Sequence, residues 1–184
     1  MKIIKLLDLI YPPVCGICSK GKNVYLCKKC EKILQIKAVF GSEEYEDKYF
    51  SNHMYIFKYD GIIRELILKY KFNEKPYLYK IFTNFLEKFK KNNLNLEKYD
   101  IIIPVPISKK RFRQRGYNQS TLISKELAKN NNIKLEKNVL IKYTNNPLIL
   151  APKNANIIFA KLPKTKLGFI LCKTKATAII KVAP

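Results

Sequence analysis

Apolar residues recur every three or four positions in several stretches of the chain, and this spacing predicts amphipathic helices. The predicted helices cover residues 3–10, 62–72, 77–89 and 118–130. Pro76 suits the first turn of the third helix, because proline lacks the N–H that a first turn leaves unpaired. One face of that helix carries an apolar stripe, which is expected to be core rather than a platform for stacking bases: Tyr77, Ile81, Phe82, Phe85, Leu86 and Phe89.

Strands are predicted where apolar and polar residues alternate or where a short apolar run ends at turn residues. Residues 54–59 alternate, residues 101–106 form the run "IIIPVP", and residues 139–143 are a further candidate. The acidic segment 41–51 between the first helices is predicted as a linker. From residue 101 onwards the order is strand, basic segment, helix and strand, so an α/β fold with a parallel sheet is expected.

The chain is strongly basic, with Lys+Arg 36 against Asp+Glu 14 and a net charge of +22 over 184 residues. A polyanion is therefore an expected partner, although an AT-rich genome would also raise the lysine content. No apolar run approaches the ~20 residues that span a bilayer, so no membrane span is expected. The first residues contain Asp8 and no small-residue cleavage site, and a cytoplasmic location is predicted.

Four of the five cysteines form two Cys-x-x-Cys pairs separated by eight residues, a spacing typical of a structural zinc ribbon. These predicted zinc ligands are Cys15, Cys18, Cys27 and Cys30. Two disulfides or a redox-active pair are the alternatives. A short helix is predicted to follow the last cysteine, at residues 31–36.

Five lysines lie near the predicted zinc site, and they either contact nucleic acid or offset the negative charge of the thiolates: Lys20, Lys22, Lys28, Lys29 and Lys32.

Five bases follow the apolar run at 101–106 within seven positions: Lys109, Lys110, Arg111, Arg113 and Arg115. Ligands of open α/β sheets bind beyond the carboxyl ends of the strands, where helix N-termini attract anions. A basic loop at that place predicts a phosphate site, and the alternative is a solvated charged loop. Gly116 allows the backbone to approach a ligand closely, and Asn118 is a candidate N-cap of the next helix.

Three motifs in order resemble the competence protein F (ComF) family, whose members carry an amidophosphoribosyltransferase-like domain. They are "LLDLIYPPVCGIC…LCKKC", "YDGIIRELILKYKF" and "PVPISKKRFRQRGYNQS", and the last adds Gln119 to the expected phosphate or nucleic-acid site. The resemblance covers residues 1–144. It implies a type I phosphoribosyltransferase-like fold behind a zinc-binding module, and a role in natural transformation with single-stranded DNA.

The chain departs from the family pattern after Glu136, since no Asp or Glu follows. The family continues with an acidic pair and Thr-Thr-Gly, the loop that holds phosphoribosyl pyrophosphate (PRPP). Residues 137–184 instead contain nine Lys and no Arg. A truncation or frameshift near residue 145 is therefore expected. The predicted units are a zinc-ribbon module at 1–40, an incomplete phosphoribosyltransferase-like domain at 50–144, and a poorly ordered tail at 145–184.

Three functions from different classes follow. The first is a competence factor that binds single-stranded DNA through the basic loop, with a competence helicase or related DNA-uptake proteins as partners. The second is an enzyme that uses PRPP and Mg²⁺, which the missing acidic loop disfavours. The third is a zinc ribbon that binds partner proteins. No catalytic residue is assigned, because His53, the only histidine, is expected to be structural.

Overall fold

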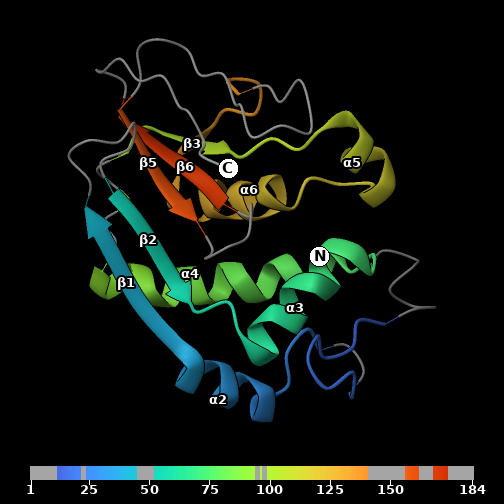
Figure 1. The fold of residues 1–184 in the computed structure, drawn as a ribbon. Helices are drawn as coiled ribbons and strands as arrows, with labels where there is room; N and C mark the ends of the chain where they lie inside the picture. The colour runs from blue at the N-terminus through green and yellow to red at the C-terminus, as the bar shows by residue number, and fades with distance from the viewer. Residues whose placement is uncertain are drawn as a thin grey trace.

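In the part of the chain that the structure describes, helices pack against a six-stranded sheet (Figure 1). The computed structural model describes residues 12–21, 24–44, 52–93, 96, 99–140, 156–161 and 168–173. The strands are β1 (Ala38–Glu44), β2 (Asn52–Phe57), β3 (Ile101–Pro104), β4 (Lys134–Leu135), β5 (Asn156–Lys161) and β6 (Gly168–Lys173). Their order across the sheet is β1-β2-β5-β6-β3-β4.

The described helices lie close to the predicted positions, except for the helix at Lys109–Arg115, which the sequence did not predict. They are α2 (Lys28–Lys37), α3 (Gly61–Phe72), the 3-10 helix η1 (Pro76–Leu78), α4 (Tyr79–Asn93), α5 (Lys109–Arg115) and α6 (Gln119–Asn131). Pro76 does begin the first turn before α4, as the sequence predicted. The helix predicted at 3–10 lies outside the described residues.

The hydrophobic core lies between the sheet and helices α3, α4 and α6. Phe85 of α4 and Phe57 of β2 are both buried, with ring centroids 5.2 Å apart in an edge-on arrangement. The apolar stripe of α4 is therefore core, as predicted. α4 and α6 run side by side (Figure 1), and the Asn131 amide of α6 donates to Glu87 Oε1 of α4 at 2.8 Å.

The sheet is mixed, which corrects the prediction of a parallel sheet. β2 and β5 pair in parallel, as do β3 and β4, whereas the other three pairings are antiparallel. β3 and β4 are the two strands joined through α5 and α6, so this one unit has the expected parallel arrangement. The antiparallel pairings come from β1 and from the strands of the C-terminal tail.

Two predicted boundaries are also corrected. Residues 41–44 of the expected linker belong to β1, and residues 45–51 lie outside the described part. The strand that follows α6 is β4 at Lys134–Leu135, and residues 139 and 140 of the strand predicted at 139–143 form no strand. Residues 141–143 are not among those that the structure describes.

Two segments of the C-terminal tail form strands, at short apolar runs for which the sequence specified no register. β5 and β6 pair with each other and stand between β2 and β3, near the centre of the sheet. Cys172 lies in β6 opposite Ile101 of β3. The rest of the tail lies outside the described residues, and its poor order stays a prediction. In the part of the chain that the structure describes, no helix has both the length and the apolar character to cross a membrane.

Candidate metal centre and basic pocket

The four predicted ligand cysteines come together in space. Their sulfur atoms all lie within 4.8 Å of one another. Cys15 and Cys30 are buried, whereas Cys18 is exposed. The Sγ atoms of Cys18 and Cys27 are 3.8 Å apart, and the Cys27 backbone N–H donates to Cys15 Sγ at 3.5 Å. This cluster could hold a metal ion with four sulfur ligands.

The surroundings of the cluster shift the pKa values of the Cys15 and Cys30 thiols in opposite directions. Burial alone would raise the pKa of Cys15, but backbone groups of Cys27, Cys18 and Ile17 hydrogen-bond to its sulfur and bring the pKa down to about 6. Burial and the neighbouring sulfurs raise the pKa of Cys30 to about 12. A metal ion that neutralises the sulfurs together would favour the deprotonated form of every thiol.

The segment that carries the cysteines is fixed to helices α3 and α4. Gly16 lies so close to η1 that a Cβ atom there would be 2.3 Å from Leu78 Cδ2. Lys69 of α3 donates from Nζ to the carbonyl oxygens of Gly16 at 3.3 Å and Ile17 at 3.0 Å. Lys80 of α4 donates to the Tyr25 hydroxyl at 2.7 Å. We call residues 12–21 and 24–37 the cysteine module.

The basic segment after β3 forms helix α5, which corrects the prediction of a loop. Ser108 begins the helix, because its Oγ accepts from the Arg111 backbone N–H at 3.4 Å. Gly116 ends it with a φ of 73°, a left-handed conformation that glycine adopts without strain. The Gly116 N–H donates to the Phe112 carbonyl at 2.8 Å.

The bases of α5 point in two directions. Lys109, Lys110 and Arg113 are exposed, whereas Arg111 and Arg115 are half-buried. Among the residues that the structure describes, the ion pairs join Lys88 to Glu31 and Lys134 to Glu136, and none involves α5. The helix therefore presents its positive charge without a carboxylate partner from the described residues.

The half-buried side of α5 faces the end of α3. The Arg115 guanidinium lies over the Phe72 ring at 4.8 Å and donates to Gln119 Oε1 at 3.2 Å. Burial, Arg115 and Arg111 together lower the pKa of Lys71 to about 8. Three cations thus influence one another at this place, and the repulsion among them favours an anion beside them.

Hydrogen bonds hold the turn between α5 and α6 in place. Asn118 caps α6 as predicted, since its Oδ1 accepts from the Ser120 N–H at 2.9 Å, and its Nδ2 donates to the Val105 carbonyl at 3.0 Å. The buried Tyr70 hydroxyl of α3 donates to the Gln119 carbonyl at 2.8 Å. Tyr117 donates in turn to the Tyr70 carbonyl. Gln119, predicted as a site residue, has an exposed fraction of 1% and therefore supports the turn from inside.

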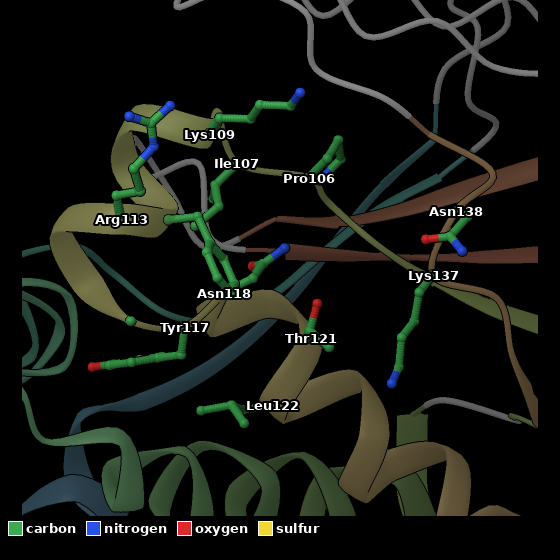
Figure 2. Close-up of a pocket in the computed structure, with 12 residues that line it drawn as sticks. Pro106, Ile107, Lys109, Arg113, Tyr117, Asn118, Thr121, Leu122, Lys137 and Asn138 are labelled. Atoms are coloured by element: carbon green, nitrogen blue, oxygen red, sulfur yellow. The ribbon is translucent and has the colours of Figure 1, made fainter.

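An open pocket of about 630 Å³ lies between α5, the start of α6 and the segment after β4. Figure 2 shows Lys109 and Arg113 on one side, Lys137 and Asn138 on the opposite side, and Thr121 between them. Apolar groups complete the lining, among them Pro106, Ile107, Phe112 and Leu122. The pocket therefore has an apolar interior and a cationic edge.

Sequence reasoning missed Lys71, Phe112 and Lys137 as neighbours of the basic segment. Lys71 lies in "ILKYKF". The sequence predicted only that this segment is part of an amphipathic helix and resembles a motif of the ComF family. Its proximity to Arg115 depends on how α3 packs, and no local pattern contains that information. Phe112 sits among the five predicted bases and was visible in the sequence as the one aromatic residue of that run.

Comparison with known proteins points to a distant relative. No family model matches the chain, and no solved structure matches it. Competence protein ComFC of Bacillus subtilis (strain 168) is 23% identical over 113 residues, which are 60% of this chain and 43% of that protein. The chain thus spans less than half the length of this relative. The similarity supports a distant relationship between this chain and the ComF family.

Proposed function

We propose that the protein is a ComF-type competence factor that binds the phosphates of single-stranded DNA through α5. The observation that carries this proposal is the cationic edge of the pocket, where Lys109 and Arg113 of α5 lie on one side and Lys137 lies on the other (Figure 2). The similarity to a competence protein supports the proposed role in competence.

Electrostatics favour a polyanion as the ligand of this surface. The exposed bases of α5 have no carboxylate partner among the described residues. Their positive charges are therefore not neutralised by that part of the protein and can attract phosphate. Arg115 and Arg111 also contribute to the lowered pKa of Lys71 behind them. Burial is the largest cause of that lowered pKa, and a phosphate close to these groups would offset the repulsion from the two arginines and raise the pKa of Lys71.

We further propose that the metal of the cysteine module is a structural zinc ion. Four ligands at about 2.3 Å in a tetrahedron place sulfur atoms about 3.8 Å apart. The Cys18 and Cys27 sulfurs already have that separation, at 3.8 Å, and no pair exceeds 4.8 Å. Four thiolates complete the coordination shell of zinc, so the ion would stabilise the module rather than bind a substrate.

The alternative function is phosphoribosyl transfer with PRPP and Mg²⁺. The parallel unit β3–α5–α6–β4 is compatible with a phosphoribosyltransferase-like domain. Mg²⁺ and a ribose, however, need carboxylate ligands, and the sequence has no Asp or Glu after Glu136. We therefore propose binding rather than catalysis as the activity of this chain.

Fluorescence anisotropy with a labelled oligothymidine at several salt concentrations tests DNA binding. Lys109→Gln combined with Arg113→Gln removes two exposed charges from the edge of the pocket. Each phosphate that the variant no longer binds should lower the slope of log affinity against log salt by about 0.7, because fewer counterions are released. Arg115 is a poorer choice, since it already contacts Phe72 and Gln119.

The matched control is Lys125→Gln with Lys129→Gln, two exposed lysines further along α6. This variant has the same net charge as the first, so a general effect of charge should appear equally in both. Equal affinities and salt slopes for the two variants would contradict a binding site on α5.

A further inference from the structure

We propose that the pocket beside α5 receives one unpaired nucleobase, which stacks on Phe112 while the flanking phosphates lie against the cationic edge. This inference deepens the proposed function and rests on it. It assigns to the site a base-recognising part in addition to phosphate contacts.

Phe112 is an exposed aromatic residue in the most basic helix of the chain. Its exposed fraction is 51%, so it contributes little to the core. Lys109, Phe112, Arg113 and Gly116 all line the pocket, which places the aromatic ring and two cations on the same side of α5. Exposed aromatic rings beside cations are the combination with which proteins bind single strands.

The pocket has the size and lining that a base requires. Its volume of about 630 Å³ lies within the usual range for small-molecule sites. Pro106, Ile107 and Leu122 supply apolar surface around Phe112. A flat aromatic ligand that carries negative charge outside its ring system suits such an interior with cations at its edge.

The polar groups of the pocket are placed for a nucleotide within a strand. Lys109 and Arg113 stand opposite Lys137, so phosphates on both sides of a bound base would meet a cation (Figure 2). Thr121 offers a hydrogen-bonding group between the two sides, and Asn138 offers another beside Lys137 (Figure 2). At Gly116 a Cβ atom would have no neighbour within 4 Å, so the backbone there leaves space for the strand.

An unpaired base fits this pocket better than a duplex. The bases of a duplex are stacked on one another and hydrogen-bonded, and only their edges are open to a protein. In a single strand the ring of Phe112 could reach the face of a base without the cost of unstacking a duplex. Stacking is tolerant of sequence, because every base has a π-face.

Paired measurements with a normal and an abasic oligonucleotide of equal length test the inference. Both have the same phosphates, so the ratio of their affinities isolates the contribution of the bases. Phe112→Leu should weaken oligothymidine binding by about tenfold and leave abasic binding and the salt slope unchanged. Phe112→Tyr, which keeps an aromatic ring, should retain the preference for the normal strand.

Different failures point to different proposals. If Phe112→Leu leaves the ratio of the two affinities unchanged, or lowers both affinities equally, the base pocket is refuted while phosphate binding stands. If neither strand responds to the Lys109→Gln and Arg113→Gln pair, the proposed DNA site itself is wrong. A circular dichroism spectrum of each variant checks that it is folded, as expected for a change at an exposed position.

Discussion

Gly116 and Asn118 set the direction of the chain between α5 and α6. The sequence predicted the cap at Asn118 correctly, because the hydrogen bond that an Asn side-chain oxygen accepts from the backbone N–H two residues later is local chemistry. For Gly116 the sequence predicted a close approach to a ligand. The structure gives it a further role, since its positive φ ends α5 and turns the chain towards α6.

Lys71 should make the proposed binding of DNA sensitive to pH. Burial, Arg115 and Arg111 lower its pKa from the usual 10.5 to about 8. Above pH 8 the free protein therefore loses this charge, whereas a bound phosphate favours the charged form. Above pH 8 the affinity for single-stranded DNA should therefore fall, by at most about tenfold for each pH unit.

Lys71→Arg is the control for this prediction, because arginine stays charged throughout this range. Anisotropy titrations at constant ionic strength should show an affinity that changes much less with pH in this variant. If the affinity of both proteins changes with pH in the same way, Lys71 lies outside the binding site.

The lowered pKa of Lys71 also affects the stability of the fold. At neutral pH the charged Lys71 destabilises the folded state, because its pKa is lower in the folded state than in the unfolded state. The free energy of unfolding should therefore rise as the pH increases from about 8 towards the pKa of the unfolded state.

At the scale of elements, α5 shows where sequence patterns fail. Its sequence "KKRFRQR" has no apolar period, and the run was therefore predicted as a loop. The signals that could have identified the helix are its two ends, Ser108 before it and Gly116 after it. The core helices α3, α4 and α6 were predicted well, because each buries a regular apolar face.

The cysteine module should depend for its order on the zinc ion that we propose it binds. We expect one zinc ion per chain, and a chelator should increase hydrogen exchange in residues 14–31 before it affects α3 and α4, since few buried apolar residues hold that segment without metal. Cys18→Ser removes one exposed ligand and should reproduce the effect of the chelator. Lys20→Ser, at a neighbouring exposed position, should retain the zinc.

Elemental analysis of protein prepared under reducing conditions measures the metal content directly. Protein without zinc, or a Cys18→Ser variant that keeps a full equivalent with unchanged exchange, would argue against a four-cysteine site.

At the scale of the whole molecule, the sequence did not predict that β5 and β6 occupy the centre of the sheet. The apolar runs in the tail are short and lack turn residues, so they indicated neither partners nor register. Their placement depends on the edges that β2 and β3 offer, which are properties of the assembled fold. The parallel pairing of β3 with β4 was predictable, because a strand–helix–strand connection brings its two strands into parallel register.

Removal of residues 145–184 should destabilise the whole protein. Without β5 and β6, both β2 and β3 lose a neighbouring strand, and the sheet separates into two pairs of strands. We expect a much lower melting temperature and a broader thermal transition by circular dichroism. Deletion of residues 174–184 alone keeps both strands and should have a smaller effect. A shortened chain that melts like the full one would contradict the central position of β5 and β6.

The position of β5 and β6 also affects how the protein is made. A ribosome completes β1 to β4 before it adds the two strands that join them, so each newly made chain first exposes unpaired strand edges. Contacts between segments so distant in the chain also slow folding, because the intervening loop must close before they form. Chaperones that bind exposed strands are thus expected to assist this protein during synthesis, and their absence should direct it towards aggregation.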